Sequence, residues 1–212
     1  MSYRVFDLLA DKYDEWYRRN RVIAENELKL IRSMGIERPC LEVGVGTGFF
    51  ASALSVDVGI DPSIGMLRIA RSRDLEVVQS FGEYLPFRRS CFRTILLIAT
   101  LCFLDKPYEA ILECTRVLAH GGKAISCIVP RDSSWGRYYR ELGRRGHPFY
   151  SQARFLTVDE MNELFRSAGL ELLCMWGTLS FTPWEEPRLE EPIPWSKGVD
   201  LGFVCASYAK IY

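Results

Sequence analysis

Apolar residues gather along this chain in short runs, separated by longer segments of mixed character. Short runs rich in aliphatic side chains are typical of strands buried inside a parallel sheet. The runs cover residues 40–43, 56–60, 75–80, 92–99 and 123–129. Helices are expected between them, over residues 22–34, 49–54, 62–72 and 107–118. Strands that alternate with helices in this way predict an α/β fold with a mainly parallel sheet.

The end of the chain follows a different pattern. A helix is expected over residues 157–167, because Thr157 and Glu160 have the spacing of a capping box. Strands are expected over residues 171–176 and 198–210. The stretch between these strands, residues 183–194, is rich in proline and glutamate and predicts a surface excursion.

Residues 130–156 interrupt the core pattern. Aromatic residues alternate there with arginines: Trp135, Tyr138, Tyr139, Phe149, Tyr150 and Phe155 with Arg131, Arg137, Arg140, Arg144, Arg145 and Arg154. The segment is too long for a plain loop, so a helix is expected over residues 134–145. Such alternation can indicate nucleic-acid binding. A local site for an anionic or aromatic substrate and a solvated amphipathic helix are the other two interpretations.

Composition narrows these alternatives. The chain has 27 Lys and Arg against 27 Asp and Glu, so neither nucleic acid nor an anionic membrane is expected as a partner. No apolar run approaches the roughly 20 residues that cross a bilayer, and the amino terminus lacks the apolar core of a signal peptide. A length of 212 residues predicts one domain with a small appendage.

Seven cysteines are scattered along the chain without a C-x-x-C pair. Cys40, Cys102, Cys127 and Cys205 fall within apolar runs, where a thiol usually acts as a small buried apolar group. The sequence therefore predicts no metal site and no disulfide framework. A reducing, cytoplasmic location fits this cysteine usage best.

A glycine-rich turn follows the first strand directly. Gly44, Gly46 and Gly48 stand at alternate positions. Glycine accepts a positive φ and has no Cβ atom, so the backbone can turn tightly there and approach a ligand closely. The second strand leads to Asp61, and in an open α/β sheet an acid at this strand tip can bind two ribose hydroxyls.

The spacing of the glycines separates two classes of cofactor. A dinucleotide site favours G-x-G-x-x-G, with the pyrophosphate at a helix N-terminus. Here the glycines run G-x-G-x-G, and Glu42 lies inside the strand before them. S-adenosylmethionine has no phosphate, and its ammonium group needs acceptors instead. A nicotinamide site and a turn that binds nothing are the alternatives.

Glu42-x-Gly44-x-Gly46-x-Gly48, followed by Asp61, resembles the class I S-adenosylmethionine-dependent methyltransferases, of the small-molecule type called methyltransferase domain 11-like. Three more segments are similar to family phrases: residues 61–67 to Asp-x-Ser-x-x-Met-Leu, residues 81–87 to Asp-Ala-Glu-x-Leu-Pro-Phe, and residues 116–122 to Arg-Val-Leu-x-x-Gly-Gly. The resemblance covers residues 6–169. It implies a Rossmann-like sheet of seven strands, the last antiparallel, with helices on both faces.

The resemblance also implies a cofactor site, with Asp61 at the ribose, the glycine turn at the methionine end and residues 81–83 at the adenine. Phe81 departs from the family, which often has an acid there for the adenine amine, and Thr94 replaces an aspartate. The expected site comprises Tyr13, Glu42, Gly44, Val45, Gly46, Thr47, Gly48, Asp61, Pro62, Phe81, Gly82, Glu83 and Ala99.

The resemblance divides the chain into four parts. Residues 1–34 are similar to a helical lid that folds over the cofactor in many small-molecule methyltransferases. One helix is expected there over residues 6–20, with Tyr13, Trp16 and Tyr17 on one face. Plain packing of that face is the alternative. The other parts are a cofactor-binding half (35–129), a substrate-side insertion (130–156) and a C-terminal helix with a β-hairpin (157–212).

The expected function is transfer of the methyl group of S-adenosylmethionine to a small-molecule substrate, with S-adenosylhomocysteine as product. A nicotinamide-dependent oxidoreductase and a catalytically silent cofactor-binding module are the alternatives. Tyr13 and His147 are the candidates for a catalytic base, and each has a structural interpretation as well. The sequence predicts neither the acceptor atom nor the oligomeric state.

Overall fold

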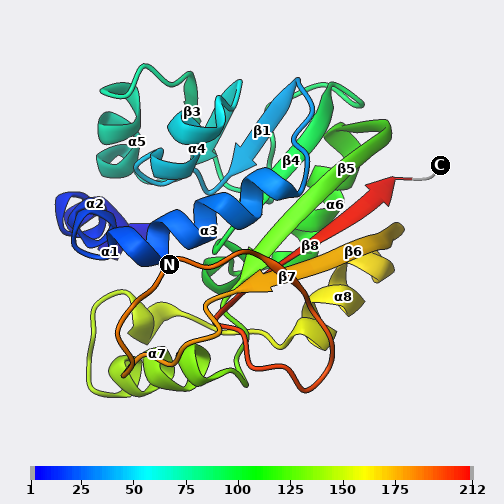
Figure 1. Ribbon diagram of the computed structural model, residues 1–212. Coiled ribbons are helices and arrows are strands. Elements are labelled where there is room, and N and C mark those ends of the chain that lie inside the picture. Colours follow the sequence, from blue (N-terminus) through cyan, green and yellow to red (C-terminus); the bar gives the residue numbers. More distant parts are fainter. Residues whose placement is uncertain (1–2, 211–212) are drawn as a thin grey trace.

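The computed structural model describes residues 3–210 and is built around one mixed sheet of eight strands, in the order β3-β2-β1-β4-β5-β8-β6-β7 (Figure 1). The first five strands of this order pair in parallel. They are β1 (Cys40–Val43), β2 (Val58–Asp61), β3 (Val77–Gln79), β4 (Phe92–Ile98) and β5 (Leu118–Ile128). All five lie at the predicted apolar runs, although β5 begins at Leu118, five residues before its predicted start, and includes the residues 120–122 that were expected to form a turn.

The other three strands complete the sheet through antiparallel pairings. β8 (Phe203–Lys210) is antiparallel to both β5 and β6 (Leu170–Thr178). The predicted seven strands with an antiparallel last strand are therefore confirmed. An eighth strand, β7 (Ile193–Pro194), pairs with the end of β6 at the sheet edge. It lies in the segment predicted as a surface excursion, so that excursion returns to the sheet for one short pairing.

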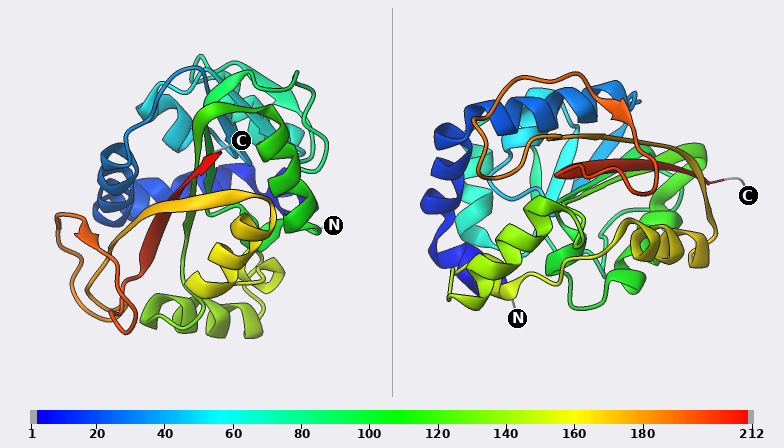
Figure 2. Two further views of the ribbon diagram at one scale, coloured as in Figure 1. Left: turned by 90° about the vertical axis from the view of Figure 1, so that its right-hand side faces the viewer. Right: turned by 60° about the horizontal axis from the view of Figure 1, so that its bottom comes forward.

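Helices cover both faces of the sheet (Figure 2). α3 (Arg21–Ser33), α4 (Phe49–Leu54) and α5 (Ile64–Arg71) pack on one face, whereas α6 (Pro107–Val117) and α8 (Val158–Ser167) pack on the other. The core divides accordingly: Leu96 and Ile98 of β4 contribute to the first layer, and Ile95 and Leu97 to the second. This is the period of two that a strand buried on both faces requires.

Two helical segments lie at the end of the sheet where the parallel strands finish (Figure 1). The first is the N-terminal segment, which was expected as one helix but breaks at Leu9 into α1 (Tyr3–Leu8) and α2 (Ala10–Arg19). The second is the insertion, which contains α7 (Ser134–Arg144), as predicted, and the short helix η2 (Tyr150–Gln152). Another short helix, η1 (Leu101–Phe103), follows β4.

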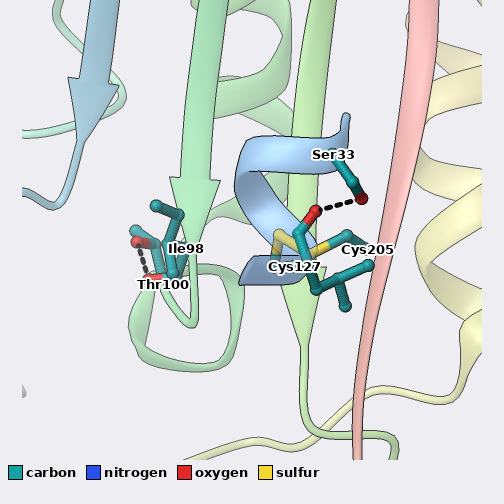
Figure 3. The surroundings of a disulfide bond; sticks show 6 residues. Ser33, Ile98, Thr100, Cys127 and Cys205 are labelled. Carbon is teal, nitrogen blue, oxygen red and sulfur yellow. Dashed lines mark hydrogen bonds between the residues drawn. A yellow bond between two sulfur atoms is a disulfide. The ribbon is translucent and has the colours of Figure 1, made fainter. Parts of the chain in front are cut away.

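A disulfide bond corrects the prediction for the cysteines. Cys127 of β5 and Cys205 of β8 are directly opposite in the antiparallel register and are bonded to each other beneath Ser33 of α3 (Figure 3). They are 78 residues apart along the chain, so their spacing gave no sign of pairing. The free cysteines are Cys40, Cys91, Cys102, Cys114 and Cys174. The cytoplasmic location stays a prediction.

Residues 3–210 contain neither a candidate metal cluster nor a membrane-spanning helix. No cluster of three or more His, Cys, Asp or Glu side chains there could hold a metal ion. No helix in the same range is long and apolar enough to span a membrane.

Candidate functional site

The glycine turn between β1 and α4 has a backbone that other residues would strain. Gly44, Gly46 and Gly48 have φ values of 75°, 53° and 76°. A Cβ atom on Gly44 would lie 2.5 Å from Thr100 Cγ2, and one on Gly48 would lie 2.3 Å from Leu75 Cδ1. Only glycine fits a left-handed backbone this close to its neighbours. The turn therefore presents backbone groups, not side chains, to the space in front of it.

Asp61 stands at the tip of β2 and faces that space. One carboxyl oxygen accepts a hydrogen bond from the Gly46 amide (3.0 Å), and the other accepts one from the Ser63 amide (2.9 Å). Burial, only partly offset by these bonds, raises the pKa of Asp61 to about 6. Two amide donors fix the carboxyl group and leave lone pairs on both oxygens, and these can accept hydrogen bonds from ligand hydroxyls.

A cavity of about 110 Å³, which we call the glycine-turn cavity, opens between this turn and α1. It brings together nine of the thirteen residues expected at a cofactor: Tyr13, Gly44, Gly46, Asp61, Pro62, Phe81, Gly82, Glu83 and Ala99. Phe81 is half exposed and meets Tyr3 edge to face at 5.6 Å. Glu83 accepts a hydrogen bond from the Lys106 amide (3.3 Å). A cofactor role for these residues stays a prediction.

The other four expected residues, Glu42, Val45, Thr47 and Gly48, do not line this cavity. Val45 packs against Gly59 of β2, where a Cβ atom would lie 2.5 Å from Val45 Cγ2. Glu42 and Thr47 are buried in the turn, and Glu42 Oε2 and the Thr47 hydroxyl have no hydrogen-bond partner. Burial, with a smaller contribution from Asp61, raises the pKa of Glu42 well above its usual value.

Two carboxylates attach the N-terminal segment over the cavity. Asp7 of α1 accepts hydrogen bonds from the Gly65 amide (2.7 Å) and the Ser63 hydroxyl (3.0 Å), at the start of α5. Asp14 of α2 accepts two hydrogen bonds from Arg73 (2.7 and 3.0 Å). Arg73 in turn donates to the Thr47 carbonyl of the glycine turn. The segment thus packs on the fold and also covers the cavity.

A second, larger cavity of about 650 Å³ adjoins the first. We call it the aromatic cavity, because its walls carry Tyr13, Trp16, Tyr17, Phe50, Phe103, Tyr139, Phe149, Tyr150, Phe155 and Phe203. Tyr13, Ala99 and Phe103 line both cavities. Ala99 follows β4 with a φ of 52°, a strained value for a residue other than glycine, and its amide donates to the Cys127 carbonyl (2.8 Å). The two cavities therefore meet at the carboxyl end of the central strand β4.

Both candidates for a catalytic base lie in the aromatic cavity. The Tyr13 and Tyr17 hydroxyls are hydrogen-bonded (3.1 Å), and burial raises the pKa of Tyr13 to about 12, so Tyr13 is a neutral phenol near pH 7. His147 stacks on Tyr150 at 4.4 Å. Burial, and to a lesser extent Lys12, lowers the pKa of His147, so its imidazole is neutral near pH 7.

The arginines of the insertion do not line the aromatic cavity, so an anion site at these side chains would lie outside it. Arg131 forms an ion pair with Glu160, Arg137 with Asp200, and Arg144 and Arg145 with Glu141. Four of the six aromatic residues of the same alternation line the cavity instead: Tyr139, Phe149, Tyr150 and Phe155.

The sequence analysis missed Glu27, a buried carboxyl group on the cavity wall. Glu27 is 7% exposed, and no described residue makes a hydrogen bond or an ion pair with it. Burial alone raises its pKa to about 8. A signal was present, because Glu27 lies one turn from Ile23 and from Ile31 on the apolar face of the helix predicted over residues 22–34.

Comparisons with known proteins agree on one family. The Methyltransf_11 model, a methyltransferase domain, matches residues 41–126. A SAM-dependent methyltransferase from Thermotoga maritima, a possible histamine N-methyltransferase, has a crystal structure that superposes with a TM-score of 0.93 at 32% identity, over 99% of this chain and 100% of the other.

The sequence relatives are less informative about function. An uncharacterized protein from Methanocaldococcus jannaschii is 34% identical over 98% of this chain and 99% of its own length. An uncharacterized protein from Mycobacterium tuberculosis is 37% identical over 82% of this chain. The matched region covers 62% of that protein's length.

Proposed function

Since this chain belongs to the class I S-adenosylmethionine-dependent methyltransferases, we propose that it transfers the methyl group to a small molecule bound in the aromatic cavity. The observation that carries the proposal is the junction of the two cavities at Ala99 and Tyr13. A methyl donor on one side of this junction and an acceptor on the other would meet at the end of β4, where ligands bind in open α/β sheets.

The residues present fit the cofactor. The glycine turn leaves no side chain between its backbone and the cavity, and Asp61 offers fixed acceptors for two ribose hydroxyls. Glu42 and Thr47 have buried polar atoms without partners, but both residues lie outside the lining of this cavity. Phe81 and Gly82 would border the adenine. When bound, the cofactor supplies an electrophilic methyl group.

The chain's own contribution is to orient the acceptor and exclude water. A methyl transfer needs the nucleophile close to the methyl carbon and in line with it, and fixed geometry can lower the barrier by several kcal/mol. Tyr13 and Phe103 border both cavities and limit where an acceptor can sit. His147 is the neutral group in this wall able to accept a proton near pH 7, whereas the Tyr13 phenol can donate a hydrogen bond.

The N-terminal segment acts as a lid in this proposal. The glycine-turn cavity is smaller than the roughly 300 Å³ or more of typical ligand sites, and Tyr3, Phe6 and Tyr13 form its outer wall. Cofactor entry therefore requires α1 and α2 to move outward. The contacts of Asp7 and Asp14 with α5 and Arg73 oppose that movement.

Asp14→Asn should speed dissociation of S-adenosylhomocysteine by roughly fivefold to tenfold, since a partly buried ion pair in which both Asp14 oxygens accept from Arg73 Nη2 is worth about 1 to 2 kcal/mol. Stopped-flow fluorescence of the lid residue Trp16 can follow this rate. Glu15→Gln is the matched control, because Glu15 lies on the same helix and pairs with the exposed Arg19. Equal rates in both variants would mean that the Asp14 contact does not hold the lid.

The proposed function is tested by calorimetric titration with S-adenosylmethionine, S-adenosylhomocysteine and NAD. We expect micromolar binding of the first two and none of NAD. Binding of NAD alone would favour the oxidoreductase, because the turn would then accommodate a pyrophosphate. If the cofactor binds but no small acceptor raises the melting temperature of the S-adenosylhomocysteine complex, the result would favour the silent module.

A further inference from the structure

We propose that the acceptor is a small organic amine, which enters the aromatic cavity as an ammonium ion and is held there by the Glu27 carboxylate. The inference rests on the proposed function for the role of the cavity as the acceptor site. It adds the chemical class of the acceptor and a residue that contacts it.

The first argument is the isolation of Glu27. A carboxyl group that is more than nine-tenths buried normally has a donor or a cation beside it, because an uncompensated buried charge is costly. The described residues supply neither to Glu27. Neighbouring Asn26, equally buried, satisfies both ends of its amide through the Arg188 carbonyl and the Glu190 amide. Glu27 is thus an exception on its own helix, and it borders a space large enough for a ligand.

The second argument is the sign of the charge inside the cavity. The charged residues in its wall are Asp11, Lys12, Glu15, Arg18, Arg19 and Glu27. All except Glu27 come from α2, and none of those five is buried. Glu27 is therefore the charged group of the interior, with no buried cation in the wall to balance it. A carboxylate or phosphate acceptor would find no buried cation to pair with there, whereas a cationic acceptor would form an ion pair with the Glu27 carboxylate.

The third argument is the set of rings around this carboxyl group. Tyr13, Tyr17, Tyr139 and Tyr150 line the same cavity as Glu27. The Glu27 charge is also one of the smaller causes of the raised pKa values of these four phenols. Tyr139 and Tyr150 stack at 4.3 Å, and Tyr13 meets Tyr17 edge to face at 5.6 Å. Aromatic rings attract cations through their negative faces, and cages of this kind hold organic ammonium ions.

The chemistry balances with an amine as acceptor. The bound ammonium transfers one proton to the Glu27 carboxylate, which frees the lone pair on nitrogen. The nitrogen then forms a bond to the methyl carbon while the carbon–sulfur bond breaks, and its electron pair stays on sulfur. The products are a thioether and an N-methylammonium ion, so the positive charge moves from sulfur to nitrogen. Glu27 keeps this proton when the product leaves and releases it to solvent when the next ammonium ion binds, because a nearby cation lowers the pKa of the carboxyl group.

The test measures binding rather than turnover. The probes are benzylamine, 2-phenylethylamine and tryptamine, each compared with its alcohol: benzyl alcohol, 2-phenylethanol and tryptophol. Each is titrated into the full chain saturated with S-adenosylhomocysteine. We expect the amines to bind more tightly than the alcohols. Glu27→Gln should weaken amine binding by roughly 30-fold, because the cation then lacks its partner. Binding of the alcohols and of S-adenosylhomocysteine should change by less than about twofold.

Glu25→Gln is the matched control, because Glu25 is exposed on the same helix. It should bind the amines like the unaltered chain. Alcohols binding as tightly as amines, unchanged amine binding in the Glu27→Gln variant, or no binding by any amine would each overturn the inference. Failure of the proposed function has a separate sign, which is the absence of S-adenosylhomocysteine binding in the unaltered chain. The amine and alcohol titrations on the free protein would then still test Glu27.

Discussion

Asp61→Ala should weaken binding of S-adenosylhomocysteine by about a hundredfold, since two hydrogen bonds to a charged acceptor contribute about 3 kcal/mol together. The side chain is held by the Gly46 and Ser63 amides, so its oxygens are already placed before any ligand arrives. Preorganised acceptors lose little entropy on binding, which makes their removal costly. Calorimetric titration with S-adenosylhomocysteine measures the effect.

The control for this experiment is Asp57→Asn. Asp57 precedes the same strand at its opposite end, where it pairs with Arg38 and accepts a hydrogen bond from the Cys40 amide (2.7 Å). That variant should lose stability without losing affinity. Circular dichroism establishes that both variants are folded. Unchanged affinity in a folded Asp61→Ala variant would remove this residue from the proposed ribose site.

The free energy of unfolding should fall as pH rises from about 4.5 to about 8, and Glu27→Gln should remove a large part of this slope. Burial raises the pKa of Glu27 from 4.5 to about 8. Between these pH values Glu27 is deprotonated in the unfolded chain but protonated in the folded chain. Each unit by which the pH rises therefore lowers the free energy of unfolding. The loss of unfolding free energy caused by Glu27 approaches about 4 to 5 kcal/mol at pH 8 and vanishes below pH 4.5.

Urea denaturation at several pH values measures this slope, and Glu25→Gln serves again as the control. Part of the slope should persist in the Glu27→Gln variant, because burial also raises the pKa values of Glu42 and Asp61. A slope identical in the two variants would show that Glu27 titrates normally. An ammonium ligand reverses the effect, since a nearby cation stabilises the carboxylate and lowers its pKa. Loss of the slope on adding an amine would therefore link the stability measurement to the proposed acceptor.

Local sequence signals correctly predicted those helices whose ends are set by residues adjacent to them along the chain. The glycine turn and Ser55, which has a φ of 54°, enclose α4, and its bounds were predicted without error. The capping box at Thr157 and Glu160 is formed in both directions, so the start of α8 was also correct. In such cases neighbouring residues along the chain make the bonds that end the element. No tertiary contact is needed to locate it.

The errors concern contacts between distant segments. The N-terminal helix breaks at Leu9, where α1 is attached to α5 through Asp7 and Gly65, 58 residues further along the chain. The disulfide depends on the register of β5 against β8, which no spacing rule gives. Glu27 looked like one charge on an amphipathic helix. Its importance arises only because that helix face meets a cavity walled by the insertion.

The proposed cofactor site was more predictable than the proposed acceptor site for a related reason. A glycine turn and a strand-end acid have fixed places in an open α/β sheet, so nine expected residues come together at one cavity. The acceptor cavity combines α2, α3, the end of β4 and the insertion, and no family phrase covers that combination. Aromatic residues at helical spacing were visible, but which of them would face one another was not.

The bond between Cys127 and Cys205 makes a covalent ring of the chain from β5 to β8. Inside that ring lie α7, α8 and most of the wall contributed by the insertion, including Tyr139 and His147. Closing a loop of this size restricts the unfolded chain by roughly 4 kcal/mol in the chain-entropy description. A protease that cuts at the exposed Arg144–Gly146 segment would leave a nicked molecule whose pieces separate only after reduction. The disulfide therefore closes a ring around the segment that carries the proposed acceptor wall, whereas α1 and α2 lie outside this ring.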